Sequence, residues 1–195
     1  MTIDSKDMLK SILISLSHID YIKPEDIPNI DLYMDQVTTF MDTHLAASKR
    51  YPEDKILTKT MINNYAKNKL LPPPTKKKYS KEHLLVMIFV YYFKGILSIT
   101  DIQALLAPLT EKYFQKDETF NIESIYKEVF SLEQSQVDKM AKDITDKFNI
   151  SRHTFESAEE DREFLQLFSF ICMLSFDVYV KKQLIEKLID QLPSS

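Results

Sequence analysis

Residues 57–106 decide the fold: LTKTMINNYAKNKLLPPPTKKKYSKEHLLVMIFVYYFKGILSITDIQALL. The segment opens with a helix cap, because the Thr58 hydroxyl can accept a hydrogen bond from a backbone N–H of the first turn. The apolar residues just before and after this cap have the spacing of a hydrophobic staple. Asn68 is the better residue for a left-handed cap at the other end. We therefore predict a short helix over residues 58–68.

The segment continues with a proline-rich and lysine-rich loop and an apolar helix. Pro72–Pro74 cannot extend a helix and favour a stiff extended path, and three consecutive lysines follow them. Ser80 is a candidate N-cap for a helix through Phe93, and residues 84–90 are all apolar. A helix that is apolar nearly all round is normally buried, so we expect this one to be the centre of its domain.

The charge of this region differs from that of the chain as a whole. Residues 49–81 contain ten Lys or Arg against two Asp or Glu, a local charge of +8, whereas the chain carries −4. The remaining residues therefore sum to −12. A basic block inside an acidic chain is the footprint expected of contacts with a phosphate backbone, so we predict double-stranded DNA as the partner.

The composition excludes several classes of function. Gly95 is the single glycine in 195 residues, whereas glycine-rich phosphate loops and nucleophile elbows need several. The four histidines and Cys172 do not have metal-ligand spacing, so we expect no metal, no cofactor and no enzymatic activity. The lone cysteine favours a reducing, cytoplasmic location. No signal peptide is evident, and the apolar window 164–180 is shorter than a membrane span, so we expect no membrane association.

The other helices follow from apolar periodicity and caps. We predict helices over residues 5–17 and over 31–47, with Asp31 as the N-cap of the second. Ser98 with Asp101 three residues on resembles a capping box, so we predict a further helix from Ser98 to about 107, where Pro108 should stop it. Residues 118–195 contain nine Lys or Arg against fifteen Asp or Glu. In this part we expect helices over residues 122–130, 132–148 and 156–192. The fold class predicted is all-α with only a short wing.

The run from Thr58 to Leu106 resembles the DNA-binding head of MerR-type regulators. In that family a capped helix with the pattern T-L-R-Y-Y-E precedes G-L-L-P, a basic wing that ends in Y-R-x-Y, a hydrophobic helix and G-x-S-L-x-E-I. Leu70–Pro72 match the Leu-Leu-Pro of the pattern, and Gly95–Ile102 match the final element. With this alignment, Asn63 falls on the family's arginine and Asn64 on its first tyrosine. Lys77 falls on the wing arginine.

A longer span, Ile27–Leu109, is similar to the bacterial family known as domain of unknown function 1836, through DLYMDQV and LTKTMINNYAKNKLLPPP. Together the resemblances imply a MerR-like winged helix-turn-helix, the first of two domains, over residues 1–117. Residues 118–195 would form a helical dimerisation or effector domain. The candidate DNA-binding residues are Thr58, Lys59, Thr60, Asn63, Asn64, Tyr65, Lys67, Lys69, Lys76, Lys77, Lys78 and Tyr79.

Two functions remain in view at this point. The first is a sequence-specific DNA-binding transcriptional regulator of MerR-like type, which forms a homodimer through its C-terminal helices and responds to an unknown small-molecule effector. The second is a cytoplasmic helical adaptor whose winged helix no longer binds DNA and whose basic patch meets an acidic protein. The missing recognition-helix arginine and the pI near 5.6 favour the adaptor, whereas the local charge of +8 favours the regulator.

Overall fold

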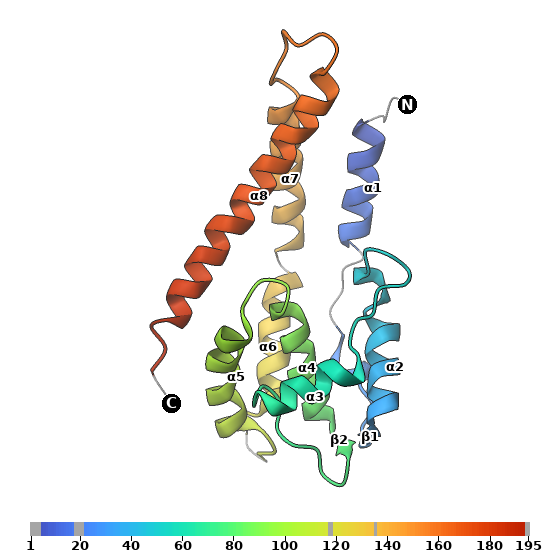
Figure 1. The fold of residues 1–195 in the computed structure, drawn as a ribbon, viewed down its shortest axis with the longest axis vertical. Coiled ribbons are helices and arrows are strands. Elements are labelled where there is room, and N and C mark those ends of the chain that lie inside the picture. The colour runs from blue at the N-terminus through green and yellow to red at the C-terminus, as the bar shows by residue number, and fades with distance from the viewer. Residues whose placement is uncertain (1–4, 18–21, 117–118, 135, 194–195) are drawn as a thin grey trace. The chain divides into compact units, whose positions relative to one another are not determined.

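The computed structural model describes residues 5–17, 22–116, 119–134 and 136–193, which are mostly α-helical with one two-stranded sheet (Figure 1). This confirms the predicted all-α fold with a short wing. The chain forms two compact units, which we describe separately. The central unit comprises Ile19–Ser131 with Glu186–Ser195, and the terminal unit comprises Met1–His18 with Leu132–Ile185. The division into functional domains at residues 117/118 stays a prediction.

Helix α4 (Lys81–Phe93) is the core of the central unit, as its composition predicts. Its residues from His83 to Val90 are all buried. The Phe89 ring lies against those of Tyr126 and Phe130, with centroids 5.4 Å and 5.6 Å away. Both partners belong to α6 (Ile122–Gln134), a helix that we had assigned to the C-terminal part of the chain.

Several helices around α4 differ from the predictions at their ends, and the helix predicted over residues 31–47 ends at His44. Helix α2 (Met34–His44) begins after Tyr33, whose N–H donates to the Gln36 side chain, so Asp31 is not its N-cap. Helix α5 (Ile99–Tyr113) has the predicted cap but continues through Pro108. Pro108 has no N–H to donate to the Ala104 carbonyl, which is its usual partner in a helix. Both residues are exposed, so water can bind this carbonyl, and the destabilisation of the helix by the proline is smaller.

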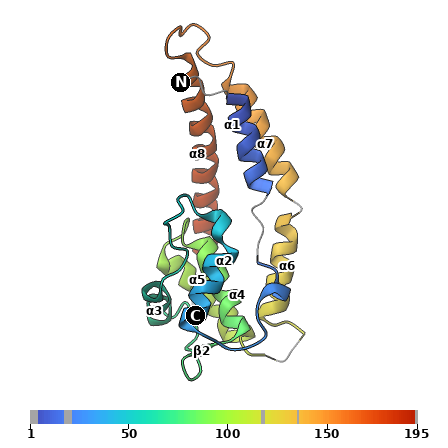
Figure 2. The ribbon, with the colours of Figure 1, turned by 90° about the vertical axis from the view of Figure 1, so that its right-hand side faces the viewer.

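A short sheet completes the central unit. Strand β1 (Leu32–Tyr33) pairs antiparallel with β2 (Lys78–Tyr79), so that Leu32 faces Tyr79. Two single-turn 3-10 helices, Pro24–Asp26 and Ala46–Ser48, precede and follow α2. Helix α3 (Lys59–Lys67) packs against α2, and Figures 1 and 2 show the chain passing from α3 to a hairpin at the end of the unit.

The terminal unit consists mainly of α1 (Ser5–Ser17), α7 (Val137–Ser151) and α8 (Arg162–Ile189), and Figure 2 shows α1 beside α7. The predicted bounds of the first helix are confirmed. The predicted break at residue 131 is wrong, because α6 continues to Gln134. The predicted 156–192 helix is shorter at both ends. Leu9, Phe148 and Phe170 form the buried core of the unit.

Helix α8 leaves much of its apolar surface uncovered. The exposed side chains include Phe164, Phe168, Ile171, Phe176 and Tyr179. The helix is long and apolar enough to cross a membrane by length and composition alone, and 6% of its most apolar window is buried. Its inner side is held to α7 by an ion pair between Lys147 and Asp177, 2.8 Å apart.

Candidate functional site

Helix α3 has one polar and one apolar side, as the sequence predicts. The Thr58 hydroxyl accepts a hydrogen bond from the Met61 N–H at 3.2 Å, which confirms Thr58 as the N-cap. Ile62 and Tyr65 are buried. The side chains on the opposite side are exposed, namely Lys59, Thr60, Asn63, Asn64 and Lys67. The helix therefore presents two amides, a hydroxyl and two ammonium groups to solvent on a rigid backbone.

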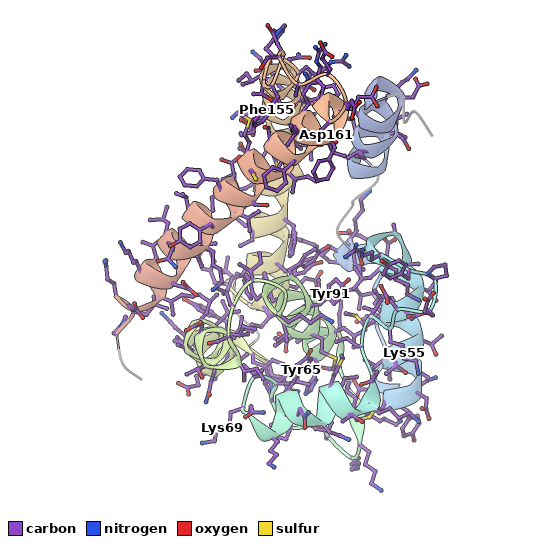
Figure 3. All side chains as sticks on the ribbon, turned by 45° about the horizontal axis from the view of Figure 1, so that its top comes forward. Lys55, Tyr65, Lys69, Tyr91, Phe155 and Asp161 are labelled. Carbon is purple, nitrogen blue, oxygen red and sulfur yellow. The ribbon has the colours of Figure 1, made fainter. Side chains whose placement is uncertain are left out.

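Helix α3 ends with a lysine in the left-handed conformation. Lys69 has φ 56°, and its N–H donates to the Ala66 carbonyl at 3.1 Å while the Leu70 N–H donates to the Tyr65 carbonyl at 2.9 Å. This pair of bonds is a Schellman motif, in which glycine is the usual residue at the left-handed position. Asn68 has φ −88°, so the prediction that it is the left-handed residue is wrong. In Figure 3 Lys69 extends outward from the end of α3.

The three consecutive lysines form the tip of a hairpin, which we call the lysine turn (residues 75–78). The Thr75 N–H donates to the Lys78 carbonyl at 3.1 Å, and the Lys78 N–H donates to the Thr75 carbonyl at 3.0 Å. Lys76 has φ 50° and Lys77 has φ 64°. Positive φ at both central residues of a two-residue hairpin is the type I′ geometry, which favours Asn-Gly and Gly-Gly. Two lysines occupy these positions instead.

The base of the hairpin is anchored in the core by a histidine. The Ser80 N–H donates to His83 Nδ1 at 3.0 Å, so this nitrogen is the acceptor of a neutral ring and Nε2 carries the proton. His83 Nε2 lies 3.4 Å from the Pro73 carbonyl, to which it donates. Burial lowers the pKa of His83, which keeps the ring neutral. The ring thus ties both arms of the hairpin to the start of α4.

Some lysines of the basic block at residues 49–81 form ion pairs with carboxylates, and others do not. Lys59 pairs with Asp35 of α2, Lys49 pairs with Asp42, and Lys81 lies 3.0 Å from Glu123. Among the residues that the structure describes, no carboxylate lies within ion-pair distance of the exposed lysines at 67, 69, 76 and 77. The Lys78 ammonium lies 5.1 Å from the centroid of the Tyr33 ring. In the described part of the chain, the exposed cations without such a carboxylate therefore include those at the end of α3 and on the lysine turn, and also Arg50 and Lys55 in the loop before α3.

Two candidate residues belong to the core. Tyr65 is 7% exposed and Tyr79 is 3% exposed. Burial raises the pKa of both phenols. Tyr65 lies on the inner side of α3 and Tyr79 on the inner side of β2, so their rings pack in the core rather than face solvent. We correct the candidate set by removing them from the exposed surface.

One supporting residue was missed by sequence reasoning. The Lys94 ammonium donates to the Ile56 carbonyl at 2.7 Å and lies 4.5 Å from the centroid of the Tyr91 ring. It thereby holds the backbone just before the Thr58 cap, and burial lowers its pKa. Nothing local marks Lys94, because its partner is 38 residues away.

In the ranges that the structure describes, no group of three His, Cys, Asp or Glu side chains is close enough to hold a metal ion. The exposed side chains of α3 and of the lysine turn carry amides, hydroxyls and ammonium groups. Such groups donate hydrogen bonds and attract anions, and the hydroxyls and amides can also accept hydrogen bonds.

Comparison with known proteins gives a family. The family model described as Domain of unknown function (DUF1836) matches residues 22–129, more than half of the chain. No curated protein and no solved structure matches the chain significantly. The matched residues contain α3, the lysine turn and α4. The chain belongs to the DUF1836 family.

Proposed function

We propose that this DUF1836 protein is a sequence-specific DNA-binding transcriptional regulator with a MerR-like winged helix. The contact surface, which we call the basic surface, consists of the exposed side of α3, Lys69 and the lysine turn. The observation that carries the proposal is the left-handed pair Lys76 and Lys77. A non-glycine residue in the left-handed conformation costs roughly 1–2 kcal/mol, and such strained residues cluster at functional sites. Glycine at both positions would remove this cost. What the protein has instead is two ammonium groups at the tip of the hairpin, which two glycines would lack.

Helix α3 is suited to contact base edges. An α-helix with its side chains is about 10–12 Å across, so it fits the major groove of B-DNA, which is about 12 Å wide. Asn63 and Asn64 are exposed side chains that can donate and accept together, as adenine recognition in that groove requires. Each good bidentate contact contributes about 1–3 kcal/mol of discrimination. The Thr58 cap and the buried Ile62 hold the helix rigid during binding.

The lysine turn is suited to contact phosphates. Its side chains project from a hairpin held at both arms, by β1 on one side and by His83 on the other. Lysine makes point-charge contacts that do not depend on base sequence, so these residues would supply affinity and register rather than specificity. Lys69, fixed at the end of α3, would add a further contact.

The exposed apolar face of α8 supports a homodimer. The exposed phenylalanines of α8 form an apolar face that a second copy could cover. A single small DNA-binding module has few base contacts, and two half-sites give useful specificity. We propose that α8 makes this dimer, that the protein is cytoplasmic, and that it responds to a small molecule. Insertion of α8 into a membrane would contradict this part of the proposal.

The alternative function is that of a helical adaptor that binds an acidic protein. It is favoured by the absence of arginine from α3 and by the pI near 5.6. Nucleic-acid contacts usually include arginine, because its planar fork binds guanine and phosphate with two hydrogen bonds. An adaptor would need the positive charge of the turn but not the amides of α3.

The two functions can be separated by salt-dependent binding to duplex DNA. Replacement of Lys76, Lys77 and Lys78 by alanine should weaken binding to any duplex. Each lost phosphate contact removes about 0.9 from the slope of log affinity against log salt, so the slope should flatten by up to about 3. The matched control changes Lys116, Lys139 and Lys142 to alanine, which are exposed but outside the basic surface. An adaptor would have no duplex affinity to lose at low salt.

A further inference from the structure

The terminal unit contains an open groove that the proposed DNA contact does not use. It has a volume of about 480 Å³ and is lined by residues of α1, of α7 and of the turn that follows α7. This volume lies within the range of small-molecule sites, which is about 300–1,000 Å³. The lining residues are Leu9, Lys10, Leu13, Ile14, Phe148, Asn149 and Arg152.

The floor of the groove is apolar and preformed. Leu9 and Phe148 are 8% and 5% exposed and belong to the buried core of the unit, against which Leu13 packs. The Phe148 ring meets the Phe170 ring of α8 edge to face, with centroids 5.4 Å apart. These contacts fix the floor from below, so an apolar ligand chain would not have to order it.

The edge of the groove is cationic. Lys10 and Arg152 are both exposed, and the Arg152 guanidinium carbon lies 5.9 Å from the centroid of the Phe148 ring, next to the apolar floor. Asn149 adds an amide that can donate. The described lining residues include no Asp or Glu. Two cations and one amide beside an apolar floor match a ligand with one anionic head and one apolar chain.

We propose that this groove binds a straight-chain carboxylate of the fatty-acid type. The carboxylate would accept hydrogen bonds from Arg152 and Lys10, since guanidinium and ammonium groups bind carboxylates by charge-assisted bonds. The chain would lie on Leu13 and Phe148. A cationic ligand with a chain of similar length has at least as much apolar area, but its head would face two like charges. The groove therefore selects by the sign of the head group.

Calorimetric titration of the full-length protein tests the proposal, with octanoate, nonanoate and decanoate below their micelle concentrations. Affinity should rise with chain length by up to about fourfold for each methylene that is fully buried. Decyltrimethylammonium should bind at least about tenfold more weakly than decanoate, because it lacks the charge-assisted hydrogen bonds. Equal affinities for decanoate and decyltrimethylammonium, or no binding of decanoate at millimolar concentration, would overturn the proposal.

Variants locate the site. Arg152→Gln and Lys10→Gln should each lower decanoate affinity by about tenfold, the loss expected for one charge-assisted hydrogen bond. Lys139→Gln on α7 is the matched control and should leave the affinity unchanged. Ile14→Glu introduces a carboxylate at a lining residue that is 51% exposed, so the fold should persist, as circular dichroism can verify. Decanoate binding that survives Ile14→Glu would belong to another apolar surface, such as the face of α8, and would overturn the assignment.

Discussion

Replacement of Lys76 and Lys77 by glycine should stabilise the protein. Both residues have left-handed φ values, 50° and 64°, which cost roughly 1–2 kcal/mol per non-glycine residue. Glycine avoids this cost but has more freedom in the unfolded chain, which takes back roughly 0.5–1 kcal/mol per site. We expect a net gain of about 1–2 kcal/mol for the double variant. For a chain of this length each kcal/mol raises Tm by about 2–4 °C.

The same double variant should lose affinity for DNA. Two ammonium groups leave the lysine turn, while the hydrogen bonds between Thr75 and Lys78 use backbone atoms and remain. The slope of log affinity against log salt should flatten by about 1.8, at 0.9 for each phosphate contact. Urea denaturation measures the first effect, and duplex binding at several salt concentrations measures the second. Opposite signs are expected for stability and for affinity.

Gln115→Gly is the matched control, because Gln115 also has a left-handed φ, 53°, and lies outside the basic surface. Its backbone N–H donates to Glu82, a bond that glycine keeps. The control should gain stability without any change in the salt slope. The reasoning would be refuted if the lysine-turn variant lost stability, or if its salt slope matched that of the wild type.

Three further predictions concern base recognition, pH and assembly. Asn63→Ala should lower discrimination between base pairs by about 1–3 kcal/mol per lost bidentate contact and leave nonspecific affinity nearly unchanged, as competition with mismatched duplexes would measure. The lowered pKa of His83 means that the unfolded chain binds more protons, so stability should fall as pH drops below about 6.5, by up to about 1.4 kcal/mol per pH unit; urea denaturation of His83→Gln should show a shallower fall. Light scattering at micromolar concentration should give twice 22.9 kDa, and Phe168→Ser with Phe176→Ser should restore the monomer; a wild-type mass of 22.9 kDa would exclude the dimer.

The features that local chemistry determines were predictable from the sequence. The Thr58 cap, the buried α4 and the Ser98 capping box depend on residues a few positions apart, and each is confirmed. The exposed side of α3 follows from helical spacing. Helix ends were less predictable where a lost hydrogen bond can be replaced by water. The helix continues through Pro108 because the unpaired carbonyl there is exposed, and the sequence does not report that exposure.

The geometry of the lysine turn was not predictable in the same way. Residue preferences place glycine or asparagine at left-handed positions, so a run of three lysines gives no sign of a type I′ turn. Its anchors are also distant in sequence: β2 pairs with Leu32 and Tyr33, and His83 bonds to a carbonyl ten residues away. Alignment with the family pattern places Tyr65 among the candidate DNA-binding residues, but such an alignment does not report which side of a helix is buried, and helical spacing puts Tyr65 on the inner side.

Selection from a random duplex library with the purified full-length protein, at about 50 mM and 200 mM salt, tests the central claim most directly. A DNA-binding regulator should enrich one sequence at both salt concentrations, while nonspecific binding should fall steeply at the higher one. Recovery of a common sequence that Asn63→Ala no longer prefers would support recognition by α3. No enriched sequence, together with no duplex affinity at the lower salt concentration, would contradict the account and favour the adaptor.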